Sequence, residues 1–117
     1  MSDIKRIQPG PRMSQAVVHG NTVYLAGQVA QGAAGGSVAE QTRDILARID
    51  ALLAEAGSDK SKLLSATIWL SDMRGFAEMN EVWDAWVAPG AAPARATVEA
   101  KLATPQYTVE IGVIAAL

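Results

Sequence analysis

The sequence contains no cysteine and a single histidine, and these absences remove several kinds of chemistry. Without cysteine the chain forms no disulfide, no thiolate metal site and no cysteine nucleophile. One histidine leaves no histidine-rich zinc site and no relay between two imidazoles. Catalysis, if there is any, must therefore use other side chains, and we expect no metal site.

Long runs of charged or apolar residues are missing too. The net charge is −2 at pH 7 and no basic run exists, which argues against binding to nucleic acid or to anionic membranes. No apolar run reaches the length of a membrane span, and the first six residues lack an apolar signal core. We therefore expect a soluble cytoplasmic protein that binds neither nucleic acid nor membrane.

Aromatic residues make up only 5% of the chain, although half of its residues are apolar. The core must therefore consist mainly of Ala, Val, Leu and Ile. A length of 117 residues suits one domain with a core of useful size, and we assign residues 1–117 to that domain.

Periodicity predicts the secondary structure. Alternation of apolar and polar residues predicts strands at residues 3–8, 14–19, 22–29, 63–70, 94–102 and 107–115. Apolar residues at helical spacing predict a helix over residues 38–56, with a capping box at its start and Gly57 at its end. A second helix is expected to begin at Ser71 or Asp72 and to end before Pro89.

The order β-β-β-α-β-α-β-β predicts an α/β (α+β) fold, with both helices on one face of a mixed sheet. The other face is then left uncovered. We expect it to carry side chains that are too aromatic and too weakly charged for a face exposed to water: Tyr24, Ala26, Gln28, Thr67, Trp69, Arg95, Thr97 and Glu110. Packing between symmetric copies of the chain would cover it.

Two late strands carry a fixed cation and a carboxylate. If the strand at residues 94–102 pairs with the last strand, Arg95, Thr97 and Glu110 share a face. A partly buried arginine needs a negative partner, and a small carboxylate ligand would supply one. An exposed ion pair between Arg95 and Glu110, which needs no function, is an alternative interpretation.

Four segments of the chain resemble the RidA (YjgF/YER057c/UK114) family. They are residues 23–29 (Val-Tyr-Leu-Ala-Gly-Gln-Val), 76–80 (Phe-Ala-Glu-Met-Asn), 93–99 (Pro-Ala-Arg-Ala-Thr-Val-Glu) and 109–111 (Val-Glu-Ile). They occur in the family's order and roughly at its spacing, and the resemblance spans essentially the whole chain. The Pro-Ala-Arg motif with the downstream glutamate is the most specific of them.

The resemblance implies a chorismate-mutase-like fold and a homotrimer with three clefts between subunits. It also implies hydrolysis of reactive 2-imino and enamino acids to 2-oxo acids and ammonia, without a cofactor. In this likeness Arg95 binds the substrate carboxylate, Glu110 positions the attacking water, and the main-chain carbonyl of Thr97 helps to hold that water. Gly27 and Asn80 match cleft residues.

Three departures set the chain on a side branch of the family. Thr97 stands where many members have cysteine, Ala26 where a serine is common, and Met13 near a cleft-wall tyrosine. A non-catalytic trimer that binds 2-oxo acids or related carboxylates therefore stays an alternative. RNA cleavage, attributed to some members, is disfavoured by the acidic balance of the chain.

Overall fold

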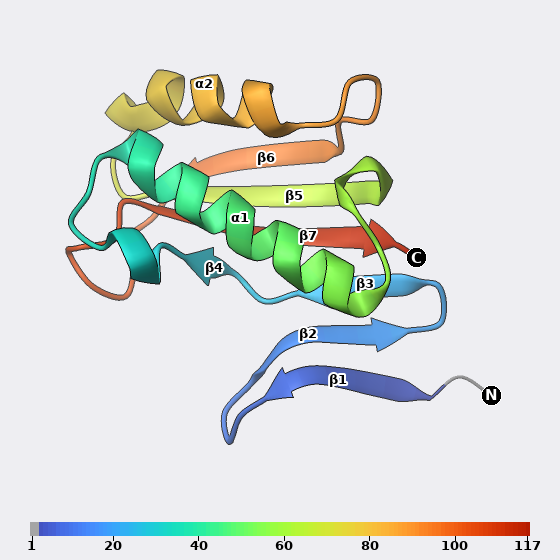
Figure 1. Ribbon diagram of the computed structural model, residues 1–117. Helices are drawn as coiled ribbons and strands as arrows, with labels where there is room; N and C mark the ends of the chain where they lie inside the picture. The colour runs from blue at the N-terminus through green and yellow to red at the C-terminus, as the bar shows by residue number, and fades with distance from the viewer. Residues whose placement is uncertain (1–2) are drawn as a thin grey trace.

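Two helices lie against one face of a mixed sheet in the computed structural model, which describes residues 3–117 (Figure 1). The helices are α1 (Val38–Ala56) and α2 (Phe76–Trp86). The strands are β1 (Ile4–Pro9), β2 (Ser14–His19), β3 (Thr22–Leu25), β4 (Gln28–Val29), β5 (Leu63–Leu70), β6 (Ala94–Glu99) and β7 (Val109–Ala116). The expected fold class is confirmed.

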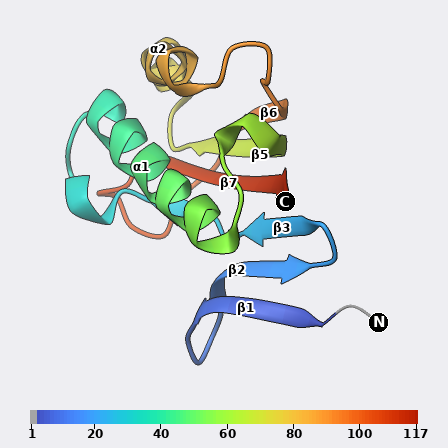
Figure 2. The same cartoon turned by 45° about the vertical axis from the view of Figure 1, so that its right-hand side comes forward.

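The strands follow the order β1-β2-β3-β7-β5-β6, and the short β4 also pairs with β7. Strands β5 and β6 are parallel and joined through α2, whereas the other pairs are antiparallel. Strands β1 and β6 are therefore the two edges of the sheet. In Figures 1 and 2, α2 lies over the β5–β6 side and α1 crosses the middle.

The hairpin predicted at Gly20-Asn21 joins β2 to β3, and Gly20 takes a positive φ of 62°. The strand expected over residues 22–29 is interrupted, because Ala26 and Gly27 separate β3 from β4. This interruption becomes part of the candidate site described below.

Helix α1 has the predicted bounds and the predicted caps. The Ser37 hydroxyl accepts a hydrogen bond from the Glu40 N–H at 3.1 Å, and the Glu40 carboxylate accepts one from the Ser37 N–H at 3.0 Å. At the other end Gly57 adopts the left-handed conformation with φ 89°. The face toward the sheet buries Gln41, Thr42, Ile45, Leu46, Ile49, Leu52 and Leu53.

Helix α2 begins later than expected. Asp72 caps a short 3-10 turn, Met73–Gly75, where its carboxylate accepts a hydrogen bond from the Arg74 N–H at 2.9 Å. The α-helix starts only after that turn, at Phe76, and ends at Trp86. Met79 and Trp83 are its buried residues. Neither α1 nor α2, the two α-helices within residues 3–117, is long and apolar enough to cross a bilayer.

Candidate functional site

Strand β5 lies between β6 and β7, so the predicted pairing of the Arg95 strand with the last strand is wrong. The connection from β5 through α2 returns the chain parallel to β5 and places β6 at the edge. Strand β7 then enters on the other side of β5 and runs antiparallel to it. Two strands joined through a helix usually lie parallel to each other in the sheet. The alternation of residues within a strand does not predict which strand becomes its neighbour.

The register assigns Arg95 and Glu110 to opposite faces of the sheet. Side chains of directly paired residues share a face. Arg95 pairs with Ala66 and Thr97 with Ile68, and both partners are buried beneath the helices. Glu110 pairs with Trp69, whose neighbours in β5 are core residues that point the other way. The expectation that the three site residues share a face is therefore wrong.

Gln28 also departs from the expected open face. It pairs with Ile111, a core residue, and is itself buried at 7% exposure. The break after Leu25 shifts the alternation, which turns the Gln28 side chain toward the helices. Tyr24, Thr67 and Trp69 lie on the open face as predicted.

On the helix side, Arg95 lies against an aromatic ring. Its guanidinium carbon is 5.3 Å from the centroid of the Trp83 ring, a distance suited to a cation–π contact. Arg95 is half-buried and forms no ion pair with any residue from 3 to 117. The guanidinium thus keeps its hydrogen-bonding capacity for a planar anion.

Two buried oxygens near Arg95 also lack partners. The Asn80 Oδ1 lies one helical turn before Trp83, and the Thr97 Oγ1 belongs to the next residue of β6 on the Arg95 side. Neither atom forms a hydrogen bond within the described part of the chain. Buried polar atoms are rarely left in this state, so ligand or water contacts at this place would stabilise them.

On the open side, Glu110 lies over a floor of two glycines. A Cβ atom on Gly27 would overlap the Glu110 carboxylate, whose Cδ would be only 3.1 Å away. A Cβ on Gly112 would be 3.5 Å from the Trp69 ring and 3.7 Å from the Gly27 Cα. The carboxylate and the indole therefore border one shallow floor, and any side chain at Gly27 would fill the space beside the carboxylate.

Burial raises the pKa of the Glu110 carboxyl, because the partly apolar surroundings disfavour its charged form. Within residues 3–117 no cation pairs with Glu110. A carboxylate with a raised pKa and no bound cation is a better proton acceptor than an ordinary surface glutamate.

Hydrogen bonds of Gln15 and Gln28 fix the backbone next to Gly27. The Gln28 amide donates to the Gln15 Oε1 at 2.9 Å and to the Ala26 carbonyl at 3.1 Å. The Ala26 N–H in turn donates to the Gln15 carbonyl at 2.9 Å. These bonds fix the break between β3 and β4, and with it the floor beneath Glu110.

Comparisons with known proteins agree over nearly the whole chain. The family described as Endoribonuclease L-PSP matches residues 3–117. A RutC family protein of Haemophilus influenzae is 48% identical over 112 residues, covering 96% of this chain and 97% of that protein. The chain belongs to the YjgF/RidA family.

Solved structures of the YjgF/RidA family have the same fold. A YjgF family member from Neisseria meningitidis is 52% identical with a TM-score of 0.94, covering 97% of this chain and 94% of that one. A YjgF/YER057c/UK114 family member from Mycobacterium tuberculosis is 28% identical with a TM-score of 0.88, covering 98% and 100%.

The residues that the sequence predicts for a site in this YjgF/RidA chain fall into two groups. Arg95, Thr97 and Asn80 lie on the helix side, and Glu110 and Gly27 on the open side. Met13 follows the β1–β2 turn, where its carbonyl accepts from the Gly10 N–H at 2.8 Å and its side chain is exposed. Within the described residues, no three His, Asp or Glu side chains are grouped so that they could bind a metal ion.

Sequence reasoning missed the two tryptophans that border these groups. Trp83 is a buried residue of α2, and nothing in the sequence linked it to Arg95. Trp69 was assigned to the open face without a role, and its place beside Glu110 follows only from the β5–β7 register.

Proposed function

We propose that this YjgF/RidA family member hydrolyses 2-imino and enamino acids to 2-oxo acids and ammonia, in clefts between the subunits of a homotrimer. The observation that carries the proposal is the separation of Arg95 from Glu110. Both are half-buried, neither is paired with an opposite charge within residues 3–117, and they lie on opposite faces of one sheet. One protomer cannot bring them to the same small substrate, whereas two protomers can.

The edges and faces of the sheet support a site between subunits. Arg95 lies on the edge strand β6, within reach of a neighbouring copy. The open face carries Glu110 together with exposed Tyr24 and Val98, at 46% and 43% exposure, and no helix covers it. Packing the open face of one copy near β6 of the next would remove this apolar surface from water and desolvate Arg95.

The chemistry needs few groups. The Arg95 fork holds the planar carboxylate of the imino acid through two parallel hydrogen bonds. Glu110 of the neighbouring protomer takes a proton as a water oxygen attacks the imine carbon, and the main-chain carbonyl of Thr97 helps to hold that water. That proton passes to the nitrogen and gives a carbinolamine, whose hydroxyl proton follows as the C–N bond breaks. Ammonia leaves, and a carbonyl replaces the imine. Gly27, Asn80 and Met13 would line the cleft.

A carboxylate-binding trimer without catalysis is the second candidate. Among the residues that the structure describes, no side chain is hydrogen-bonded to Glu110 to pass a proton on. In addition, Ala26, Met13 and Thr97 differ from the residues that are common at these cleft positions in the family. In this case Arg95 would bind 2-oxo acids, and Glu110 would shape the floor without activating water.

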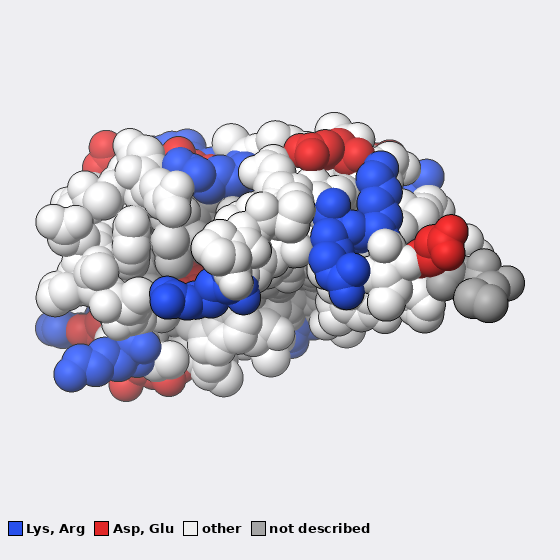
Figure 3. Space-filling model, turned by 90° about the horizontal axis from the view of Figure 1, so that it is seen from below, with Lys and Arg blue, Asp and Glu red and all other residues white. Residues whose placement is uncertain are grey.

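Cleavage of RNA, which the description of the matched family names, finds little support in the surface charge. The chain is acidic overall, at −2. On the face drawn in Figure 3, Lys and Arg form separate small groups with Asp and Glu among them. A continuous basic track for a phosphate backbone is missing from that face.

A coupled assay separates the first two candidates. Imines are generated in place by an amino acid oxidase or dehydratase, and loss of the imine is followed by trapping with semicarbazide. Acceleration of imine loss at catalytic protein concentrations supports the enzyme. Saturable binding of 2-oxobutanoate without any acceleration supports the binding trimer, and the absence of both overturns the site assignment.

A further inference from the structure

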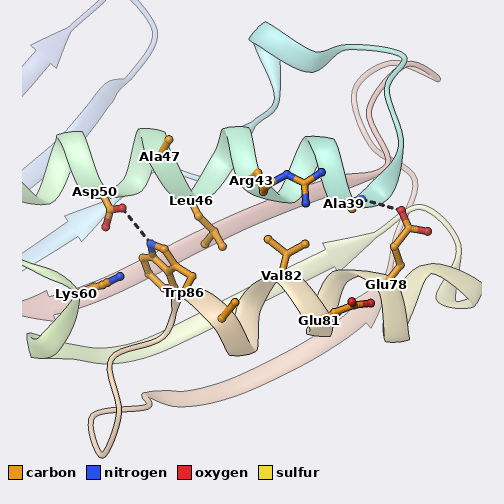
Figure 4. A pocket seen from close by; sticks show the side chains of 11 residues that line it. Ala39, Arg43, Leu46, Ala47, Asp50, Lys60, Glu78, Glu81, Val82 and Trp86 are labelled. Carbon is orange, nitrogen blue, oxygen red and sulfur yellow. Dashed lines mark hydrogen bonds between the residues drawn. The ribbon is translucent and has the colours of Figure 1, made fainter.

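A second cavity, separate from these residues, lies in a groove between α1 and α2 (Figure 4). Its volume is about 680 Å³, within the range of small-molecule sites. None of the proposed cleft residues lines it. The groove opens on the outer side of the helix layer, which packing through the sheet would leave free.

The groove has an apolar floor with charged ends. Leu46 and Val82 face each other across its middle, and Ala39, Ala47 and Ala85 widen it because their side chains are short. Such a floor favours an aliphatic or aromatic group of a few carbons over a sugar or a phosphate.

Two of the acidic side chains at the groove are already engaged. The Asp50 carboxylate accepts a hydrogen bond from the Trp86 indole at 3.0 Å, and the Glu78 carboxylate accepts one from the Ala39 N–H at 2.8 Å. The Lys60 ammonium lies 5.3 Å from the centroid of the Trp86 ring. These contacts lie at the two ends of the groove, and those of Asp50 and Lys60 fix the Trp86 indole as part of its lining.

Arg43 from α1 and Glu81 from α2 are different. Both line the groove toward the same end, and neither forms a hydrogen bond or an ion pair with residues 3–117. The nearby Glu40 carboxylate is occupied in the capping box. At that end the groove therefore offers the Arg43 cation and the Glu81 anion beside an apolar floor, both exposed and unpaired within residues 3–117.

We infer that this groove binds a free α-amino acid with an apolar side chain. The carboxylate pairs with Arg43, the ammonium with Glu81, and the side chain lies between Leu46 and Val82 toward Trp86. A zwitterion satisfies both free charges at once, whereas a simple acid or amine leaves one of them unmatched. The inference is independent of imine hydrolysis, since it uses none of the same residues.

Trp86 provides a spectroscopic signal. Its ring centroid lies 5.3 Å from that of Trp83, with the planes tilted by 50°, so a ligand against Trp86 changes the environment of both indoles. We expect L-leucine to change tryptophan fluorescence saturably and to shift amide NMR signals of α1 and α2. Two analogues, 4-methylpentanoate and 3-methylbutylamine, each lack one charge and should bind more weakly.

Variants test the two contacts separately. R43Q and E81Q should each weaken L-leucine binding about 10-fold, because each removes one charge-assisted hydrogen bond. R6Q, which changes an exposed arginine of β1, is the matched control and should bind like the parent. Ala47→Met, which fills the groove from an exposed helix position, should abolish binding.

Three results would overturn the inference: no saturable response to L-leucine, NMR shifts confined to β6 and β7, or equal affinity in the parent, R43Q and E81Q. Dispersed amide spectra for every variant would show that any loss of binding is not a loss of folding.

Discussion

At the scale of single residues, Arg95 and Glu110 were singled out from their residue types and their strand alternation. Alternation correctly separated Arg95 and Thr97 from Ala96 and Val98, but it does not say which set faces the helices. The small residues Ala96 and Val98 are exposed, and Arg95 places its guanidinium over the Trp83 ring instead. A long side chain at an edge strand can reach water from either face, which sequence patterns cannot reveal.

We predict that Arg95→Ala abolishes carboxylate binding and imine hydrolysis while the chain stays folded. Losing one partner of a desolvated charge pair costs about 2–5 kcal/mol, or roughly 30- to several-thousand-fold in affinity. Calorimetric titration with 2-oxobutanoate and circular dichroism measure the two effects. Arg95→Lys is the control and should fall between parent and alanine, because it keeps the charge without the fork. A folded alanine variant with the parent rate would make Arg95 structural.

We predict that Glu110→Gln lowers kcat about 100-fold or more and changes 2-oxo acid affinity only a few-fold. The parent's rate should fall as the pH drops through the pKa of Glu110, which burial raises from its ordinary value. The rate that remains in Glu110→Gln should lack this acid limb. Parallel loss of binding and rate would instead make Glu110 a structural partner.

The same raised pKa has a consequence for stability. In the folded chain the charged form of Glu110 is disfavoured, so Glu110 lowers stability above its folded pKa and ceases to do so below its unfolded pKa. Glu110→Gln should therefore melt at or above the parent temperature at pH 7, and the difference should disappear in acid. Thermal melts at the two pH values measure this, and a less stable variant at pH 7 would contradict it.

At the scale of elements, local signals predicted most of the fold. Helix α1 and strands β2 and β5 have the predicted bounds, because capping residues, turn glycines and periodicity are local. The predictions failed where side chains make unforeseen bonds. Asp72 closes a 3-10 turn ahead of α2, and Gln28 bonds to Gln15 and Ala26 at the break after β3. Such contacts depend on distant neighbours.

We predict that Ser37→Ala lowers the free energy of unfolding by about 0.5–2 kcal/mol, because the Glu40 N–H at the start of α1 loses its acceptor. Chemical denaturation measures the change. Ser37→Thr, which keeps a hydroxyl, should retain most of the parent stability. Equal losses in both variants would show that the hydroxyl bond does not cap the helix.

At the scale of the whole molecule, strand order decides what one protomer can do. The order β7-β5-β6 follows from the helical crossover and cannot be read from alternation within single strands. It separates the two proposed reacting groups and thereby makes assembly the central question. We predict a homotrimer, and Val98→Arg should shift it toward monomers because it places a charge in the open face. Light scattering measures the mass, with Ala54→Arg on the exposed side of α1 as the control.

If each cleft takes Arg95 from one protomer and Glu110 from its neighbour, two inactive variants should restore each other. Arg95→Ala and Glu110→Gln, unfolded together and refolded in equal amounts, would form mixed trimers in which about a quarter of the seams hold both native residues. We therefore expect about a quarter of the parent's rate of imine hydrolysis from the mixture. The double variant in one chain, refolded with parent, serves as the control for simple dilution. Inactive mixtures whose mixed composition is verified by mass spectrometry would place both groups in one protomer's site. That result would contradict the pairing of β6 and β7 with β5, which places Arg95 and Glu110 on opposite faces of the sheet.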